Sequence, residues 1–476
     1  MFAMNTSSSA NEPGNGRIFP AGQMTLFILI TALFFLWAIP NNLNDVLIRQ
    51  FMKSFEITRF RAGLLQSAFY MGYFLLAIPA ALVMRKLGYK FGFLTGLLLY
   101  GMGTLLFWPA AIVGQYWFFL MALFVIATGL SFLETASNPF IAQMGSPQSS
   151  EQRLNFSQAF NPLGSITGVI IGKVFIFSGI ELRPDEIAAK QAAGTYKAYL
   201  AFETMRVVKP YLILGAVVLV WAVLILIKKF PAIQSEHEDG GDHELFSDHF
   251  CSPFHHLKDE YKFGLFTSYI FAFLWALIQF LHLPKLIKYR HFRLAVLAQF
   301  AYVGAQVGTW SYLIQYVQDN TRLGEKAAAN YLIYSLIAFG VGRFASTALM
   351  RLVRPNLLMG SYAAINILLV FVGVLHPGWI GVWAMVLTSF FMSLMFPTIF
   401  ALGLKGLGPN TKIGGSLIVM AIIGGAVLTP LMGLINDRTH SVALAYLVPL
   451  AGYVVVGLYG FFGSHITTAL PAESFD

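Results

Sequence analysis

The sequence predicts an all-α membrane protein that crosses the bilayer many times. Only 11% of its 476 residues are charged, whereas an ordinary soluble domain carries about 25%, so lipid is the expected solvent. Apolar stretches of about 20 residues, long enough to span a bilayer, recur along most of the chain. Spans must be helical because lipid cannot satisfy free backbone groups, and the long apolar runs lack the alternation of a membrane β-barrel.

About twelve such segments follow one another, six on each side of a polar stretch in the middle of the chain. The first six are expected at 21–46, 62–84, 91–113, 115–143, 154–179 and 208–228. The second six are expected at 293–317, 327–350, 356–375, 378–403, 413–435 and 441–463. The predicted domains are therefore two six-helix bundles at 21–229 and 293–466, a connector at 230–292, and tails at 1–20 and 467–476.

The two predicted bundles resemble each other weakly, as an internal duplication would. ALVMRKLGYKFG at 81–92 aligns with TALMRLVRPNLLMG from 347, and SNPFIAQMG from 137 aligns with FPTIFALGLKG from 396. The second alignment places Glu134 opposite Met392, so packing of the repeated unit does not itself require an acid at this position. Transporters that are built from such repeats bind their substrates near the middle of the membrane.

Basic residues predict the orientation, because short cytoplasmic loops collect them. Four groups fall on one side if both termini are cytoplasmic: Arg85, Lys86 and Lys90; Lys228 and Lys229; Arg351 and Arg354; Lys405 and Lys412. The loop between the first two spans goes against this rule, since it carries Arg49, Lys53, Arg59 and Arg61. No cleavage site of the A-x-A type follows the first span, which we interpret as a retained helix rather than a signal peptide.

The connector contains a polar part and a hydrophobic part. Residues 231–260 hold five of the ten histidines and the lone Cys251, but their spacing matches no metal-ligand motif, so a solvated linker is favoured over a metal site. Residues 264–283 carry no formal charge and are long enough to span. A crossing there would place the basic loops of the second bundle outside, so we expect an interfacial segment, followed by the basic anchor KLIKYRHFR.

Two acids, Asp45 and Glu134, fall well within apolar segments. A charge at the bilayer centre costs about 2.5–3.5 kcal/mol on insertion scales, which makes each a functional candidate. In FFLWAIPNNLNDVL (34–47), Trp37, Asn41 and Asp45 share one helix face beside Asn42, and Pro40 frees a backbone carbonyl. The alternative is that Asp45 belongs to the following loop and that the asparagines cap the helix end.

Glu134 lies in the apolar stretch GLSFLETASNPF. It is either a structural acid, hydrogen-bonded within the bundle, or a proton carrier. Low-dielectric surroundings disfavour the charged form of a carboxyl group. A carboxyl group whose solvation changes between two states of the protein would bind a proton on one side and release it on the other. The energy available is about 1.4 kcal/mol per pH unit and about 2.3 kcal/mol per 100 mV for each proton.

Amides and aromatic rings recur on other spans. Gln158 and Asn161 lie on one face of the fifth span, and Gln299, Tyr302, Gln306 and Trp310 fall near one face of the seventh. Amides pair with hydroxyl groups and rings cover C–H patches, which suits a polyhydroxylated ligand, although amides also join helices. Two buried cations, Lys173 and Arg343, could either pair with an acid or extend to the membrane surface. The nucleophile, zinc and phosphate-loop motifs GxSxG, HExxH and GxxxxGK[ST] are absent from the sequence.

At these residues the chain resembles the bacterial L-fucose:proton symporter family of the major facilitator superfamily. The resemblance rests on FFLWAIPNNLNDVL, GLLQSAFYMGYF, ETASNPF, RLNFSQAFN and IVMAIIGGAVLTPLMG, and extends over nearly the whole chain. It implies the major facilitator fold of two six-helix bundles and proton-coupled import of L-fucose or a related hexose by alternating access. Relatives in the family also carry glucose, galactose or amino sugars. Segment 264–283 and Lys173 depart from the usual pattern.

The resemblance also implies roles for individual residues. Asp45 and Glu134 become the proton-coupling carboxylates, and Asn42, Gln158 and Asn161 become sugar contacts. The full expected substrate site comprises Trp37, Asn41, Asn42, Gln66, Tyr70, Asn138, Gln158, Asn161, Gln299, Tyr302, Gln306 and Trp310. We expect a bacterial inner-membrane protein that functions as a monomer, with a proton as coupling ion, no cofactor or metal, and no nucleic-acid or obligate protein partner. A membrane enzyme acting on lipid-linked sugars and a non-transporting sugar sensor are the alternatives.

Overall fold

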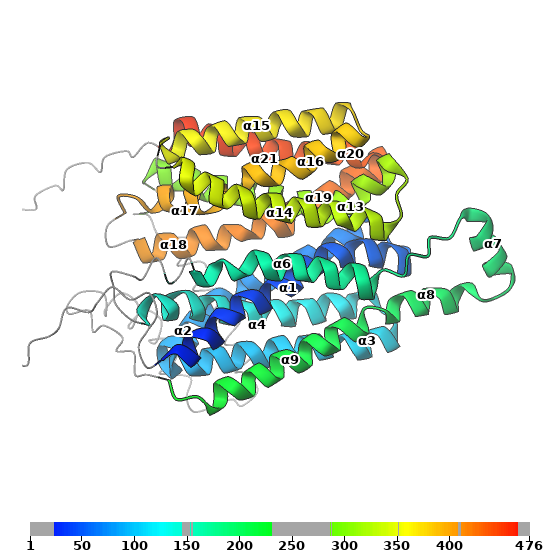
Figure 1. Ribbon diagram of the computed structural model, residues 1–476, viewed down its shortest axis with the longest axis horizontal. Coiled ribbons are helices and arrows are strands. Elements are labelled where there is room, and N and C mark those ends of the chain that lie inside the picture. Colours follow the sequence, from blue (N-terminus) through cyan, green and yellow to red (C-terminus); the bar gives the residue numbers. More distant parts are fainter. Residues whose placement is uncertain are drawn as a thin grey trace, which may run out of the picture.

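The computed structural model describes residues 23–144, 153, 156–230, 286, 288–350, 352–407 and 411–464. Within these ranges the chain forms helices and no strand, and the long helices run side by side along one direction (Figure 1). They form two halves, residues 23–230 and 286–464, which pack against each other. The all-α fold expected from the sequence is confirmed.

The helices of the N-terminal half largely follow the predicted spans. Its elements are α1 Met24–Ser54, α2 Arg59–Leu105, α3 Phe107–Val113, α4 Tyr116–Gln143, α6 Phe160–Ile171, η2 Gly172–Ile176, α7 Pro184–Ala192, α8 Tyr196–Met205 and α9 Val208–Ile227. Two predicted spans lie within α2, which is broken at Gly88, where φ is 82°. The left-handed conformation of this residue is one that glycine adopts without strain.

The helices of the C-terminal half are more often interrupted than those of the N-terminal half. Its elements are α13 Arg290–Thr321, α14 Glu325–Leu349, α15 Pro355–Leu375, α16 Trp379–Met392, α17 Met395–Leu404, α18 Thr411–Met420, η4 Ala421–Ile423, α19 Gly424–Thr439, α20 Val442–Ala445, α21 Leu447–Leu458 and η5 Tyr459–Gly463. Predicted span 378–403 corresponds to α16 and α17, which are separated at Ser393 and Leu394.

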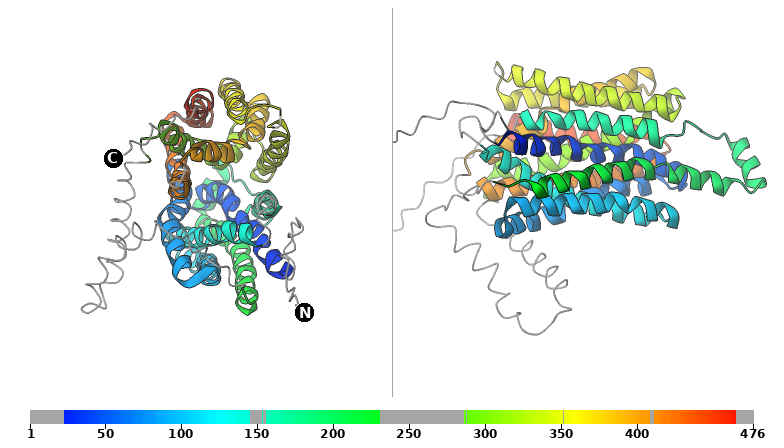
Figure 2. Two further views of the ribbon diagram at one scale, coloured as in Figure 1. Left: turned by 90° about the vertical axis from the view of Figure 1, so that its left-hand side faces the viewer. Right: turned by 60° about the horizontal axis from the view of Figure 1, so that its bottom comes forward.

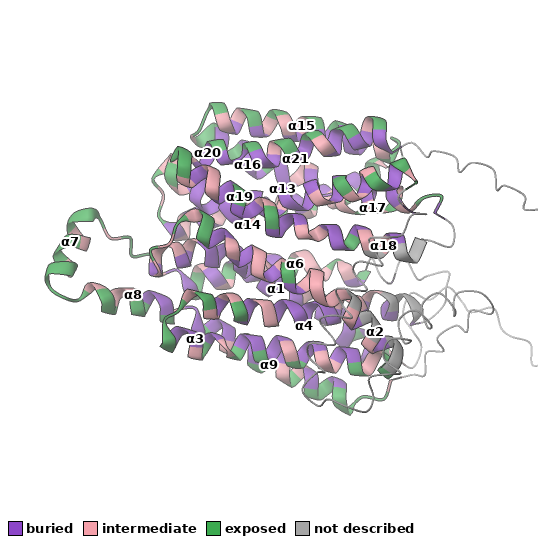
Figure 3. Cartoon of the chain, turned by 180° about the vertical axis from the view of Figure 1, so that it is seen from behind, coloured by how far each residue is buried: buried purple, intermediate pink, exposed green. Residues whose placement is uncertain are grey.

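Ten stretches of the described residues are long and apolar enough to cross a membrane. The two predicted spans missing from these ten, 62–84 and 293–317, lie in the first part of α2 and in α13. Large apolar side chains such as Ile112, Val220 and Phe344 are exposed on the outside of the bundle, as Figure 3 shows for the exposed class as a whole. Such a surface suits contact with lipid. Twelve crossings remain the expectation.

Packing partners repeat in the two halves, as the internal duplication predicts. In the N-terminal half α1 packs along α6, and α2 packs along α4 and α9. In the C-terminal half α13 packs along α19, α14 along α16, and α15 along α21. The halves meet where α2 lies against α19 and where α6 lies against α14, which are corresponding pairs of helices, and the first of these contacts is the more extensive (Figure 2).

Close packing of α1 on α6 depends on small residues. A Cβ atom added to Gly168 would lie 2.5 Å from the carbonyl oxygen of Ile39, and one added to Gly164 would clash with the carbonyl of Phe35. The corresponding contact of the other half places Gly424 against the carbonyl of Phe300. Helices in a membrane commonly approach through such small residues, since shape complementarity replaces the hydrophobic effect there.

The proline in α1 has the effect predicted from the sequence. Pro40 cannot donate a backbone hydrogen bond to Leu36, one turn earlier, so that carbonyl is free. The Tyr100 hydroxyl donates to it at 3.0 Å. The helix remains continuous from Met24 to Ser54, and Asp45 therefore lies inside it rather than in the loop that follows.

Two helices outside the predicted spans mark one end of the bundle. α7 and α8 project beyond the other helices, at the right of Figure 1. The sequence does signal α7, since Pro184 occupies its first turn together with Asp185 and Glu186. We call the end that carries Ser54, Glu203 and Glu325 the α8 face, and the end that carries Met24 and Lys228 the N-terminal face. The predicted segment 264–283 and the histidine-rich connector lie outside the described residues.

Candidate functional site

A cavity of about 170 Å³ lies between the two halves, beside Asp45. An apolar cavity of about 150 Å³ accommodates benzene, so this one has room for a single six-membered ring. Its N-terminal wall is polar and its C-terminal wall is largely aromatic and aliphatic. It is lined by Asn41, Asn42, Asp45, Gln66, Tyr70, Asn161, Pro162 and Ser165 on one side, and by Tyr302, Gln306, Val307, Trp310, Leu336, Phe339, Arg343 and Phe396 on the other.

Asp45 is buried and is bonded to both halves of the protein. Gln66 Nε2 and Ser311 Oγ each donate to Asp45 Oδ1 at 2.9 Å. Gln66 Nε2 also lies 2.9 Å from Ser311 Oγ, which closes a triangle of three buried polar groups. None of the ion pairs formed among the described residues involves Asp45. Within the described part of the chain the donors to this carboxyl group are therefore neutral, and one of them, Ser311, comes from the opposite half.

Glu134 lies on α4, outside the cavity lining, and is half-buried. Residues described by the structure form no hydrogen bond or ion pair with its carboxyl group. One turn further on, Asn138 Nδ2 donates to the Glu134 backbone carbonyl at 3.2 Å, and Gln158 Nε2 lies 3.4 Å from Asn138 Oδ1. Tyr70, in the cavity wall, interacts electrostatically with both Asp45 and Glu134.

Several buried polar atoms around the cavity lack partners among the described residues. They are Asn41 Oδ1, Asn42 Oδ1, Gln66 Oε1 and Arg343 Nε. Buried polar groups in folded proteins are nearly always hydrogen-bonded, by protein or by another molecule. Three acceptors and one donor that converge on one cavity are suited to a ligand that both donates and accepts hydrogen bonds, such as a polyhydroxylated molecule.

The C-terminal wall offers flat apolar surfaces. Trp310 Nε1 donates to Ser389 Oγ at 3.0 Å, and its ring meets that of Phe339 edge-on at 5.2 Å. The guanidinium of Arg343 lies over the Phe339 ring at 5.0 Å. These contacts hold the rings in place, and they locate Arg343 in the cavity wall rather than at the membrane surface.

The cavity brings together nine of the fourteen predicted site residues. They are Asn41, Asn42, Asp45, Gln66, Tyr70, Asn161, Tyr302, Gln306 and Trp310. Glu134, Asn138 and Gln158 form the neighbouring group described above. Trp37 is buried in the core against Phe34, at 4.3 Å between ring centroids, and Gln299 is buried away from the cavity lining.

Four functional positions have no distinctive signal in the sequence. Three of them line the cavity, Ser165, Phe339 and Phe396, and the fourth, Ser311, donates a hydrogen bond to Asp45. Serine and phenylalanine are common in membrane helices, so neither type stands out as a buried acid does. Helical spacing from Gln306 and Trp310 does not lead to Ser311 either. The other predicted cation, Lys173, donates to Asn330 Oδ1 of the opposite half at 2.5 Å.

Contacts between the halves are concentrated at the α8 face. Every hydrogen bond or ion pair that we find between the described parts of the two halves lies at the level of Asp45 or nearer to this face. The deepest are the Ser311–Asp45 bond and the bond from Ser67 to the Ala426 carbonyl. Towards the α8 face follow Tyr312 to the Arg59 carbonyl, at 2.8 Å, and the backbone amides of Arg59 and Phe60 to the Asp437 carboxylate. The protein is closed between the cavity and the α8 face.

Comparison with known proteins agrees with this architecture. The Major Facilitator Superfamily profile matches residues 23–416. The chain is 41% identical to the L-fucose-proton symporter of Escherichia coli (strain K12), over 93% of this chain and 94% of that protein. It is 32% identical to a glucose/galactose transporter of Brucella abortus, over 91% and 93% of the two chains. A crystal structure of the transporter FucP in the outward conformation is 40% identical, has a TM-score of 0.64, and aligns over 92% of this chain and 99% of that one.

Proposed function

We propose that this chain, which belongs to the L-fucose–proton symporter family of the Major Facilitator Superfamily, imports a monosaccharide together with a proton. The observation that carries the proposal is the cavity between the halves, where unpartnered amide oxygens surround a buried carboxyl group. Its relatives are transporters, so the alternative of an enzyme acting on lipid-linked sugars is set aside. The cargo is L-fucose or a related hexose.

The two walls of the cavity match the two faces of a sugar. Hydroxyl groups on one edge donate to Asn41, Asn42 and Gln66, whose oxygens are otherwise without partners among the described residues. The C–H faces of the ring pack on Trp310 and Phe396. A 6-deoxy sugar such as L-fucose also presents a methyl group, which suits the aliphatic and aromatic wall better than a hydroxyl does.

Proton coupling follows from the way Asp45 is held. With the α8 face closed, Ser311 of the C-terminal half and Gln66 of the N-terminal half both donate to this carboxyl group. Opening of the α8 face withdraws Ser311 and exposes Asp45 to water on that side. Asp45 then takes up a proton from that side, and Glu134 takes part in passing it on. Closure returns the loaded site to the interior of the protein, so sugar and proton cross together.

Orientation gives the direction of transport. The basic groups at residues 85–90 and 228–229 support an orientation in which the N-terminal face and both termini lie in the cytoplasm, and the membrane we propose is the bacterial inner membrane. The α8 face is then outside, and the structure corresponds to the state closed towards the outside. The outward conformation in the name of the FucP crystal structure would be the other end of the same cycle.

A sugar panel on proteoliposomes tests the function. The purified full chain is reconstituted, and L-fucose, D-galactose, D-glucose and an amino sugar are added outside in a weakly buffered medium. We expect at least one sugar to make the medium alkaline as protons enter with it, and an imposed inward pH gradient to drive its accumulation. Sugar entry without alkalinisation would contradict proton coupling. Failure of every sugar to enter or bind would contradict the cargo class.

A further inference from the structure

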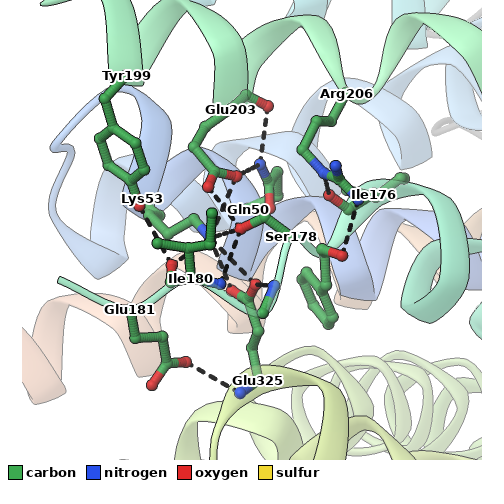
Figure 4. Close-up of polar contacts among 12 residues, drawn as sticks. Gln50, Lys53, Ile176, Ser178, Ile180, Glu181, Tyr199, Glu203, Arg206 and Glu325 are labelled. Atoms are coloured by element: carbon green, nitrogen blue, oxygen red, sulfur yellow. Dashed lines mark hydrogen bonds and ion pairs between the residues drawn. The ribbon is translucent and has the colours of Figure 1, made fainter.

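A buried cluster of three charged residues joins the halves at the α8 face. Lys53, at the end of α1, lies 3.1 Å from both carboxylate oxygens of Glu325 and 3.2 Å from Glu203 Oε2 (Figure 4). The side chains of both glutamates are 0% exposed and that of Lys53 is 10% exposed. Ion pairs of this kind differ from surface pairs, because loss of one partner leaves an uncompensated charge away from water.

The two glutamates are held differently. Glu203 belongs to the same half as Lys53 and accepts hydrogen bonds there from Gln50 at 3.0 Å and from Ser178 at 2.5 Å. Glu325 begins α14 in the opposite half. Among the described residues its carboxylate accepts only from the N-terminal half, from Lys53 and from the backbone amide of Gly179 at 2.8 Å. Separation of the halves therefore breaks the bonds of Glu325 and leaves those of Glu203 intact.

Contacts with the opposite half account for three of the four basic residues that disagree with the expected orientation, namely Arg49, Lys53 and Arg59. The loop between the first two spans is rich in basic residues although it lies on the side that should have few. Arg59 pairs with Asp319 of the opposite half at 2.6 Å, and Arg49 donates to Gln318 of that half at 2.5 Å. Lys53 is the most buried of the three side chains. Their positive charges are used to bind the other half.

We propose that Lys53 is a latch residue, which binds Glu325 across the interface, keeps the α8 face closed and so sets the balance between the two states of the transport cycle. The inference rests on the alternating access of the proposed function. Two carboxylates share one lysine in the closed state, so the cluster carries one excess negative charge. When the face opens, water reaches all three groups and the excess charge is no longer costly.

This arrangement predicts opposite effects for three neutral substitutions. Lys53→Gln leaves two carboxylates facing each other away from water, so it favours opening most strongly. Glu325→Gln removes one charged bond across the interface and favours opening less. Glu203→Gln removes the excess negative charge and leaves Lys53 and Glu325 as a balanced pair, so it favours closure. If these residues served only to stabilise the fold, their substitutions would not shift the balance between the open and closed states in opposite directions.

Spin-label distance measurements test the latch without any sugar. Cys251 is replaced by Ser, cysteines are introduced at the exposed positions Lys197 and Thr439 of the two halves, and the full chain is studied in lipid nanodiscs. We expect Lys53→Gln to raise the ratio of long to short distances about tenfold, equivalent to about 1.4 kcal/mol, and Glu325→Gln to raise it about threefold. Glu203→Gln should lower this ratio. Arg183→Gln, at an exposed pair with Asp185, should leave it unchanged.

A charge exchange provides the rescue. Lys53→Glu and Glu325→Lys should each favour opening, whereas the double variant places the lysine on the opposite half, facing two carboxylates, and should restore closure. Unchanged distances in both Lys53→Gln and Glu325→Gln, or a shift of Glu203→Gln in the same direction as Lys53→Gln, would overturn the latch. A negative sugar panel with the predicted distance shifts would instead overturn the cargo alone.

Discussion

Asp45 accepts hydrogen bonds from both halves, and only its ability to lose a proton distinguishes it from an asparagine of the same shape. Asp45→Asn retains an oxygen that Ser311 and Gln66 can still contact, so the fold should persist. It cannot exchange a proton. We expect loss of proton-driven accumulation, measured as uptake of labelled sugar against its gradient, with the melting temperature nearly unchanged. Accumulation at the original level would remove Asp45 from coupling.

Ser311 tests whether the bond across the interface matters apart from the acid itself. A typical hydrogen bond contributes about 0.5–1.5 kcal/mol, and Ser311 makes its bond to Asp45 in the closed, loaded state, so Ser311→Ala should reduce the initial rate of uptake several-fold. Ser346→Ala is the matched control, because this buried hydroxyl donates to Gly342 within its own helix. Equal rates for the two variants would show that the Ser311–Asp45 bond does not influence transport.

Glu134 is separated from the cavity lining, which allows its coupling role to be tested apart from sugar contact. Glu134→Gln should abolish accumulation driven by a pH gradient, because the side chain no longer carries a proton. Exchange of labelled for unlabelled sugar across the membrane needs no net proton movement and should continue. Undiminished uphill uptake by this variant would assign Glu134 a structural role only.

At this scale, rare residue types were predictable and common ones were not. An acid or a run of asparagines within an apolar span is costly, so Asp45, Asn41 and Asn42 stood out, and all three line the cavity. Gln299 lies on the same face of α13 as Gln306 but seven residues earlier, and it is buried away from the cavity lining because the sequence does not fix the depth of the cavity along the helix. The hydroxyl of Ser311 donates to Asp45, a contact that depends on how α13 is rotated against α1.

Among the helices, α1 and α6 must stay in close contact because together they carry much of the polar wall of the cavity. Gly168→Ala would place a methyl group 2.5 Å from the Ile39 carbonyl. Overpacking of this kind costs about 1–3 kcal/mol, so the melting temperature should fall by several degrees and sugar binding should weaken. Gly457→Ala is the control, since its added carbon meets Ala363 at an ordinary 3.6 Å. Equal stabilities of the two variants would contradict this account of the contact.

Helix positions followed from the apolar runs, whereas the interruptions and additions did not. The break between α16 and α17 and the division of the last two spans involve no loss of hydrophobicity, so composition cannot reveal them. α7 and α8 are shorter than a membrane span, so the length of an apolar run does not indicate them. Glu203 lies on α8, and the charge balance at the α8 face could therefore not be predicted from the apolar runs either.

For the whole molecule, the repeat and the family resemblance predicted the two halves, and the packing partners agree with that prediction. The conformation of the protein could not be predicted, because the same sequence must adopt both a conformation closed at the α8 face and one closed at the N-terminal face during a transport cycle. Here the closed end is recognised from bonds that join residues far apart in sequence, such as Arg59 with Asp319 and with Asp437. Arg49, Lys53 and Arg59 disagree with the orientation rule when the sequence is considered alone. Their partners in the opposite half explain why these basic residues lie on this side of the membrane.

The orientation of the second half depends on whether segment 264–283 crosses the membrane. α9 ends next to Lys90, whose ammonium donates to the Leu226 and Lys228 carbonyls, and α13 begins where His291 contacts the Lys405 carbonyl. Lys90, Lys228 and Lys405 belong to the groups expected in the cytoplasm. Both positions should therefore lie on the cytoplasmic side, so we expect a membrane-impermeant reagent to reach tags at positions 240 and 290 only after the cells are permeabilised. A tag at Lys190 on α7 is the control and should be reached from outside. Tags at 240 and 290 on opposite sides would show that the segment crosses the membrane. The second half would then be inverted, Lys53 and Glu325 would lie on opposite sides of the membrane, and the closed state described here could not form.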